Sequence, residues 1–244
     1  MKYILNDRAL LKISGSDSEL FLQNQLSNDI NKLDSSSIQL NAYCQHQGKI
    51  IGLFWVMSYK GSFLISFPKD LLEIIKSRLQ MFVIMSDVII ENVSDNYKQI
   101  GLIDEKHSKA FFIKDNLSLL IDSSKEKIEL KELDGNQWTK ACIDSFLPEV
   151  FIDTSEKFVP QMLNLDIGEV GVNFSKGCYP GQEVVARLHY LGSAKRRLFA
   201  FESDLKMHVG DSLYCATSKT ALARGNRYKG SGIVVTKVLY NSLF

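Results

Sequence analysis

The sequence lacks the features that mark several classes of protein. Its 244 residues contain only four cysteines, Cys44, Cys142, Cys178 and Cys215, and no two of them form a C-x-x-C pair. This spacing argues against a zinc knuckle and against a self-contained iron–sulfur cluster, so we predict no metal site. A disulfide scaffold is not expected either, because a chain of this length with 45% hydrophobic residues can bury a large core.

An excess of charge of one sign is also missing. The 29 lysines and arginines are balanced by 28 aspartates and glutamates, which leaves a net charge of +1. Proteins that bind the nucleic acid backbone strongly carry a basic excess, so we expect no strong direct nucleic-acid binding. The local group Arg187, Lys195, Arg196 and Arg197 could form a small basic patch, and a solvated strand edge explains it equally well.

No apolar run reaches the length of a membrane span. The best candidate, residues 50–57, is too short and is bounded by turn residues. The first eight residues already contain Lys2, Asp7 and Arg8, and they show no signal-peptide pattern. We therefore expect a cytoplasmic protein without a membrane partner, and nothing in the pattern demands more than a monomer.

The order of segments predicts an α+β fold. Strand patterns at residues 9–13, 38–44, 49–57 and 63–67 are separated by turn residues, and a further strand is expected at residues 83–93, broken near Ser86 and Asp87. Ser16 and Glu19 form a capping box that predicts a helix to about residue 26, and Pro68 begins a second helix with one apolar face. This alternation suggests a split βαβ, ferredoxin-like sheet in the N-terminal part.

The second half of the chain predicts shorter elements. Strand-like segments continue to about residue 133, and a short helix is expected from residue 136 to near Pro148. Residues 197–202, 212–215 and 232–239 predict a small β-barrel-like unit. We place the domain boundary near Gly192, which gives a body of residues 1–192 and a small, short C-terminal β domain of residues 193–244.

The stretch KGCYPGQE, residues 176–183, concentrates the chemistry of the chain. Gly177, Pro180 and Gly181 restrict the backbone to a tight turn. Lys176 lies two residues before Cys178, and a nearby ammonium lowers the pKa of a thiol and makes the thiolate available near neutral pH. We therefore interpret Cys178 and Lys176 as candidate catalytic residues. We also expect Gly181 to let the backbone approach a ligand closely.

The rest of the stretch supports this turn. Tyr179 completes the motif, and Gln182 and Glu183 fall in the first turn of a predicted short helix, where a carboxylate is favoured by free N–H groups. Glu183 and Arg187 are four residues apart and can pair on one helical face. The alternative for all of these residues is a well-fixed turn with a buried, inert cysteine and a structural ion pair.

These residues resemble the signature of the YgfZ family, which reads Lys-Gly-Cys-Tyr-x-Gly-Gln-Glu and continues into the Arg-Arg-Leu run seen here at residues 196–198. Residues 158–165, 13–19 and 23–29 resemble further segments of that family. The resemblance implies a folate-binding relative of the glycine-cleavage T-protein, with a GcvT-like three-lobed arrangement around a central folate cavity. It also implies tetrahydrofolate, or a one-carbon derivative of it, as the cofactor. The C-terminal domain is shorter here than is usual in the family.

The resemblance also implies folate-binding residues. Trp138 matches a tryptophan that contacts folate, and a flat aromatic ring is suited to stacking on a pterin or benzoyl ring. Arg8 stands where the family has its other folate-contacting tryptophan, and an arginine there could reach the glutamyl carboxylate of folate. Gln161 and Asn164 could bind a pterin edge or satisfy buried backbone groups, and the sequence leaves both alternatives open.

The function implied by the resemblance is that of a folate-binding accessory protein that maintains iron–sulfur enzymes. It would thereby support tRNA modification by 2-methylthio addition, with radical tRNA-modifying enzymes as clients, an indirect link to tRNA, and Cys178 as the essential thiol. Two alternatives remain open. One is a folate-dependent aminomethyltransferase of the glycine-cleavage type, against which Cys178 and the short C-terminus argue. The other is a non-enzymatic docking module, so whether the chain is an enzyme is undecided.

Overall fold

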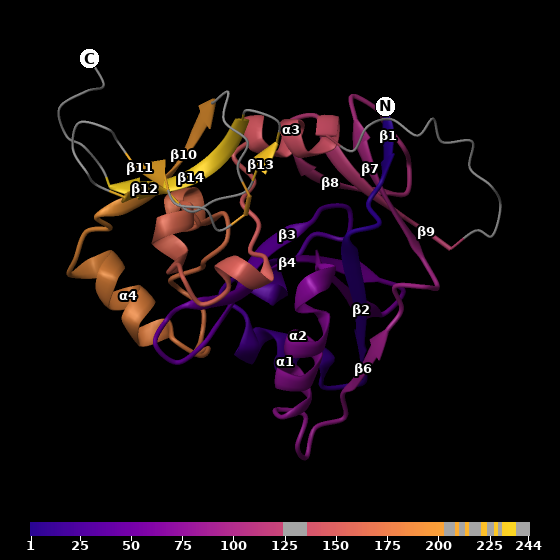
Figure 1. Ribbon diagram of the computed structural model, residues 1–244. Helices are drawn as coiled ribbons and strands as arrows, with labels where there is room; N and C mark the ends of the chain where they lie inside the picture. Colours follow the sequence, from indigo (N-terminus) through magenta and orange to yellow (C-terminus); the bar gives the residue numbers. More distant parts are fainter. Residues whose placement is uncertain are drawn as a thin grey trace.

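The computed structural model describes residues 1–123, 136–202, 208–209, 213–214, 221–223, 227–228 and 231–237 (Figure 1). Within these ranges the chain forms antiparallel sheets with helices packed on them, so the predicted α+β class is confirmed. The expected C-terminal strands fall inside the description only at Leu213–Tyr214 and Ser231–Lys237, and Cys215 lies outside the described residues.

The first sheet has five strands in the order β3-β4-β5-β2-β6. Its strands are β2 (Arg8–Ser14), β3 (Gln39–Cys44), β4 (Ile50–Tyr59), β5 (Ser62–Pro68) and β6 (Ile89–Asn92), with helices α1 (Ser18–Gln25) and α2 (Leu72–Gln80) in the connections. Strand β2 lies between β5 and β6 and is antiparallel to both. Strands β5 and β6 therefore run parallel on either side of it, joined through α2, which is the predicted split βαβ unit.

Strand β4 explains why this sheet is the centre of the fold. All eight residues from Ile50 to Met57 are buried, because both faces of the sheet are covered. Phe54 and Val56 join the cluster that packs against α1 and α2, whereas Leu53 and Trp55 point into a second cluster that includes Trp138. Successive residues of a strand point to opposite faces, so one apolar run serves two cores.

Two local expectations in this half are wrong. Helix α1 begins at Ser18 without a side-chain cap, because the Ser16 hydroxyl donates to the Asp87 carboxylate instead. The first part of the strand expected at residues 83–93 forms a projecting loop, with Ile84 77% exposed and Met85 fully exposed at a φ of 65°. Among the described residues, no strand pairs with the backbone of this loop. The part after the expected break at Ser86 and Asp87 forms β6 as predicted.

The second sheet has the strand order β1-β7-β9-β8. Its strands are β1 (Lys2–Ile4), β7 (Lys98–Ile103), β8 (Ala110–Lys114) and β9 (Leu117–Asp122), and helix α3 (Asn136–Asp144) packs beside it. Gly101 on β7 makes room for the Trp138 ring, because a Cβ at that position would lie only 2.6 Å from the indole. Strand β1 thus belongs to the second sheet, whereas strand β2, which follows it in the chain, belongs to the first sheet.

Helix α4 (Gln182–Tyr190) lies at the left of Figure 1, and the C-terminal strands run from there toward α3, which β13 and β14 contact. Strand β10 (Arg196–Glu202) pairs with β14 (Ser231–Lys237), which also pairs with β13 (Arg227–Tyr228), and β11 (Leu213–Tyr214) pairs with β12 (Ala221–Ala223). The described residues also form the 3-10 turns η1 (Ile30–Lys32), η2 (Lys69–Leu71), η3 (Ile152–Thr154), η4 (Pro160–Leu163) and η5 (Ile167–Glu169). The boundary near residue 192 stays a prediction.

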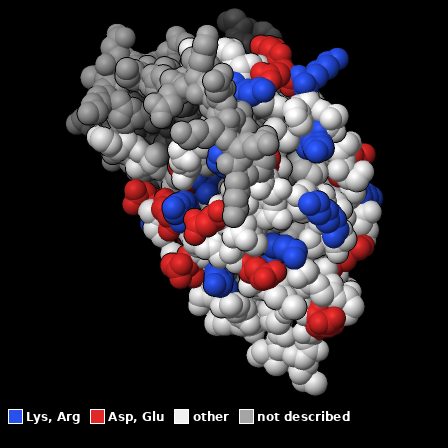
Figure 2. Space-filling model, turned by 90° about the vertical axis from the view of Figure 1, so that its right-hand side faces the viewer, with Lys and Arg blue, Asp and Glu red and all other residues white. Residues whose placement is uncertain are grey.

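The surface agrees with the balanced composition. On the face shown in Figure 2, blue and red side chains are interspersed among uncharged ones. None of the helices in the described ranges has the length and apolar character that crossing a bilayer requires.

Candidate functional site

The loop that carries Cys178 is fixed at its C-terminal end by Gly181. This residue is the N-cap of α4, as the predicted helix requires, and has a φ of 82°. A Cβ at Gly181 would lie 2.5 Å from the backbone oxygen of Gln45 and 2.7 Å from the Cα of Gly48. The close backbone approach that we expected toward a ligand is therefore made to the turn between β3 and β4.

The N-terminal end of the loop is fixed by Lys176, whose position differs from our expectation. Its side chain is buried, and its ammonium donates hydrogen bonds to the backbone carbonyls of Gln23, Leu26 and Asn28, at 2.5 to 2.9 Å. Three donors meet three acceptors, so the charge is held at the C-terminal end of α1 and not at the Cys178 thiol. Burial lowers the pKa of Lys176 to about 8, and the nearby Asp29 carboxylate opposes that shift.

Cys178 itself is exposed, so the alternative of a buried, inert cysteine is wrong. The next residue, Tyr179, is buried, and its ring lies 5.3 Å from the Lys176 ammonium. Burial raises the pKa of the Tyr179 hydroxyl, and the thiol of Cys44 raises it further. Cys44 is fully buried, which raises its own pKa to about 12. The two cysteines are thus opposite in character, one accessible and one kept as a neutral thiol.

The first turn of α4 is linked to the start of the loop by a hydrogen bond, and several residues of the loop and the helix remain exposed. The Gln182 amide donates to the backbone oxygen of Lys176, 3.4 Å away, and Gln182 and Glu183 occupy the first helical turn as predicted. Gly177 has open space around it. Glu183 and Arg187 both lie exposed, and none of the ion pairs formed by the described residues joins them, so the expected pair is not present.

The second candidate site is a cavity of about 190 Å³ between the first sheet and α3. Trp138 and Trp55 form two of its walls, with their ring centroids 6.4 Å apart and their planes at 70°. Arg8, Glu149 and Cys142 also line it. Burial raises the pKa of the Cys142 thiol, so that thiol stays protonated. The structure therefore brings together two of the predicted folate residues, Trp138 and Arg8.

Arg8 is placed differently from our expectation of an arginine free to reach a carboxylate of folate. Its side chain is buried, its Nη1 donates to Oε1 of Glu149, and its Nε donates to the hydroxyl of Ser66 at 2.8 Å. The guanidinium carbon lies 3.7 Å from the centroid of the Trp55 ring. Burial raises the pKa of Glu149, and the Arg8 charge opposes that rise. The charge of Arg8 is thus already paired inside the protein.

Gln161 and Asn164 bind backbone groups, which is the second of the two alternatives the sequence left open. The Gln161 amide donates to the Val185 oxygen at 2.7 Å, and the Asn164 amide donates to the Leu198 oxygen at 3.1 Å. Asn164 also has a left-handed φ of 58°, a conformation that asparagine tolerates well. These two residues hold α4 and β10 to the turn η4, and neither lines the cavity.

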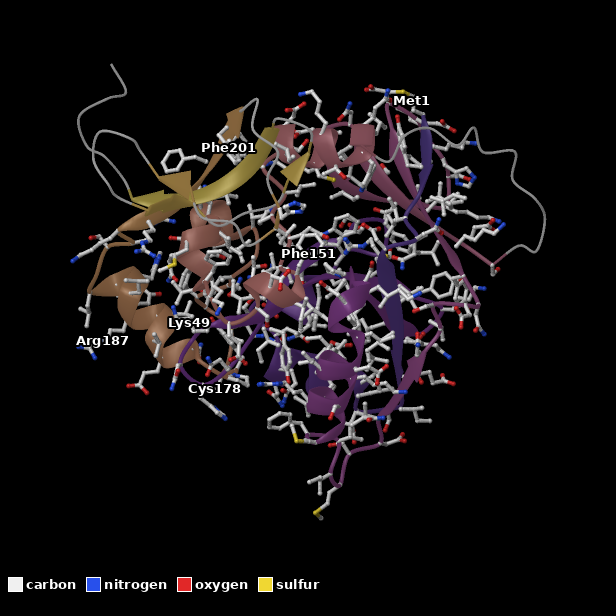
Figure 3. All side chains as sticks on the ribbon, in the orientation of Figure 1. Met1, Lys49, Phe151, Cys178, Arg187 and Phe201 are labelled. Carbon is white, nitrogen blue, oxygen red and sulfur yellow. The ribbon has the colours of Figure 1, made fainter. Side chains whose placement is uncertain are left out.

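The two sites are separate. Cys178 and the Arg187 end of α4 lie at the lower left of Figure 3, whereas Phe151, which lines the cavity, lies near the centre. Cys178 does not belong to the lining of the cavity. Sequence reasoning missed Glu149, because no local pattern indicates that a residue 141 positions after Arg8 becomes its partner.

Comparison with known proteins gives the family. No family model matches the chain. An uncharacterized protein of Haemophilus influenzae is 34% identical over 207 residues, which cover 81% of this chain and 72% of that protein. The tRNA-modifying protein YgfZ of Colwellia psychrerythraea is 28% identical over 233 residues, which cover 83% of this chain and 71% of that protein. The tRNA-modifying protein YgfZ of Buchnera aphidicola is 29% identical over 232 residues, which cover 82% of this chain and 72% of that protein. The chain is a YgfZ-like member of the GcvT superfamily.

The fold comparison agrees with that family. The crystal structure of the glycine cleavage system aminomethyltransferase T from Bartonella henselae superposes with a TM-score of 0.70 and covers 97% of this chain and 78% of that one. The two sequences share 10% identity, so the likeness shows the GcvT-like fold and does not extend to the activity. The chain thus has a GcvT-like fold, with the Cys178 loop on one side and the tryptophan cavity near the centre in Figure 3.

Proposed function

We propose that this protein is a folate-binding accessory factor that supports tRNA modification by maintaining iron–sulfur enzymes, and that it acts through Cys178. The role in tRNA modification is supported by the relatives named tRNA-modifying protein YgfZ. Its clients would be iron–sulfur proteins such as radical tRNA-modifying enzymes, so the link to tRNA is indirect.

The observation that carries the proposal is an exposed thiol on a loop whose two flanks are held by the body of the protein. Lys176 anchors one flank through three carbonyls, and Gly181 packs the other flank against the β3–β4 turn. A thiol held in this way reaches outward to a partner without a large loss of loop entropy. Cysteine thiolates are the usual ligands of iron–sulfur clusters and also attack sulfur species, which suits the maintenance of such enzymes.

The folate part of the proposal is supported by the cavity beside Trp138. Aromatic walls favour a flat ring, and Trp55 and Trp138 supply two such walls. Tetrahydrofolate, or a one-carbon derivative of it, would be held there by Trp138 and by the polar groups at the same wall. Because Cys178 lies outside this cavity, folate would serve as a bound cofactor of the body while the thiol faces the client.

The experiment that tests the proposal measures the 2-methylthio content of tRNA nucleosides by mass spectrometry in a deletion strain of the source organism. The strain carries the wild type, Cys178→Ser, Ser175→Ala or an empty plasmid. Ser175 is an exposed residue of the same loop and serves as the matched control. We expect loss in the deletion, rescue by the wild type and by Ser175→Ala, and no rescue by a well-expressed Cys178→Ser. Unchanged 2-methylthio content in the deletion strain would refute the role.

A further inference from the structure

The carboxylate of Glu149 is a polar group of the cavity to which neither the sequence motifs nor the comparisons assign a role. Its Oε1 accepts a hydrogen bond from Arg8, and its side chain keeps 16% exposure at the cavity wall. No described residue donates a hydrogen bond to its second oxygen, Oε2. Glu149 therefore offers free acceptor capacity at the wall of the cavity.

Arg8 holds this carboxylate in a fixed place. The guanidinium is anchored on three sides, by Glu149, by the Ser66 hydroxyl and by the face of the Trp55 ring. The Ser66 hydroxyl donates in turn to the Gln99 side chain, 2.6 Å away. Nη2 of Arg8 is buried without a hydrogen-bond partner. A group so anchored positions Glu149 and cannot swing out to meet the carboxylate of a ligand.

The charge of the lining points to the kind of ligand. Among the described residues, the charged ones that line the cavity are Asp7, Glu149 and Arg8, which amount to two carboxylates against one guanidinium. This balance disfavours an anion and favours a neutral group that presents N–H donors. The glutamyl tail of a folate carries carboxylates, so it is the end that this cavity disfavours.

The size and walls of the cavity point to the same end of the molecule. Pockets that bury a whole drug-sized ligand measure roughly 300 to 1,000 Å³. The cavity here measures about 190 Å³, so it accommodates one ring system and not a complete folate. Two tryptophan rings bound it, and flat heterocycles are the ligands that such walls contact over the largest area.

We infer that Glu149, positioned by Arg8, is the specificity-determining residue of this cavity and selects a neutral, flat heterocycle through N–H groups that donate to its carboxylate. This inference rests on the proposed folate binding and makes it specific. In a folate, the edge that carries such donors is the amino-pyrimidinone edge of the pterin ring. The pterin end would then enter the cavity, and the glutamyl tail would lie outside it.

The test uses the full-length protein and two halves of folate, titrated separately by calorimetry under anaerobic conditions. One half is 6-methyltetrahydropterin, the other is p-aminobenzoylglutamate, and tetrahydrofolate itself is titrated beside them. The variants are Glu149→Gln and the double variant Arg8→Met/Glu149→Met. The double variant replaces the buried pair by apolar residues, which is often neutral for stability, so it remains informative where the single variant fails to fold.

The matched control is Glu156→Gln, which removes the carboxylate of a different glutamate–arginine pair. Glu156 pairs with Arg78 at 2.9 Å on the surface, away from the cavity lining. We expect wild type and this control to bind the pterin half equally. The cavity variants should bind it about 10- to 100-fold more weakly, as is typical for the loss of hydrogen bonds to a charged group.

The outcomes separate the inference from the function on which it rests. Binding of tetrahydrofolate together with p-aminobenzoylglutamate, unaffected by the cavity variants, would overturn the role of Glu149 while folate binding stands. Binding of the pterin half that depends on Glu149 supports the inference even if the full folate binds weakly. If wild type binds none of the three compounds, both the inference and the folate part of the proposed function are wrong.

Discussion

Replacing Lys176 by methionine should loosen the Cys178 loop and destabilise the whole protein. Methionine keeps the length and apolar stem of lysine but removes the ammonium that donates to the carbonyls of Gln23, Leu26 and Asn28. Those carbonyls lie in the last turn of α1 and just after it, where no intrahelical donor reaches them. The substitution therefore removes a link between α1 and the loop, and it leaves acceptors without their partner.

The magnitude follows from two opposing terms. A hydrogen bond from a charged group contributes about 1.5 to 3 kcal/mol, so three of them contribute roughly 5 to 9 kcal/mol. Burial of the ammonium opposes this, because a fall of the Lys176 pKa from 10.5 to about 8 corresponds to roughly 3 kcal/mol. The expected loss in the free energy of unfolding for Lys176→Met is therefore about 2 to 6 kcal/mol, measured by urea denaturation at pH 7.

The same burial gives a pH signature. The folded state releases the Lys176 proton near pH 8 and the unfolded state near pH 10.5, so between these values the unfolded state binds more protons. Stability from this group is present above pH 10.5 and is lost as the pH falls toward 8. The stability difference between wild type and Lys176→Met should therefore widen with pH in this window, by up to about 1.4 kcal/mol per pH unit.

The control is Lys49→Met, which removes an ammonium with one carbonyl contact of 3.4 Å. We expect it to change stability by less than about 0.5 kcal/mol. As a second readout, the rate of Cys178 labelling by a thiol reagent, after subtraction of the rate in Cys178→Ser, should differ between Lys176→Met and wild type. If Lys176→Met is as stable as Lys49→Met and labels at the wild-type rate, the anchoring role of Lys176 is refuted.

Three further predictions concern other parts of the molecule. Gly181→Ala should lower the free energy of unfolding by at least about 2 kcal/mol, because the new Cβ would lie 2.5 Å from a backbone oxygen and the φ of this residue is 82°. Gly177→Ala should leave stability nearly unchanged, and urea denaturation of the two variants compares them. At pH 8, iodoacetamide followed by peptide mass spectrometry should label Cys178 and spare Cys44, whose burial raises its pKa to about 12, and labelling of Cys44 in the folded protein would contradict its placement. Gly101→Ala should displace the Trp138 indole, because the new Cβ would lie 2.6 Å from that ring. We expect calorimetry to show tetrahydrofolate binding weakened about 10-fold or more. An unchanged affinity would argue that the Trp138 ring makes no contact with folate.

The elements that sequence reasoning found are those with a local cause. The apolar run of β4, the alternation around it and the glycine at the start of α4 each act through neighbours in the chain, so their effect can be predicted from spacing. The exposed thiol belongs to the same class, because turn residues on either side of Cys178 place it on a loop. The apolar stretch containing Ile84 and Met85 misled the prediction, since hydrophobicity alone does not supply a pairing partner.

The features that sequence reasoning missed depend on partners far away in the chain. Lys176 meets carbonyls about 150 residues before it, and Arg8 meets Glu149 after 141 residues. The residues next to Lys176 in the chain do not show whether its ammonium binds a thiol or the end of a helix, and the residues next to Arg8 do not indicate its partner. Likewise the role of Gln161 in holding α4 depends on where η4 and α4 meet, which tertiary packing decides.

The wall of the cavity has an optical consequence. The chain contains two tryptophans, and both of them border this one space. At a centroid separation of 6.4 Å and an angle of 70° between ring planes, the two indoles can couple excitonically and exchange excitation energy. The ultraviolet emission and circular dichroism of the protein thus originate, for their indole part, at the cavity itself. The molecule carries its own spectroscopic label for occupancy of that space, and no dye needs to be attached.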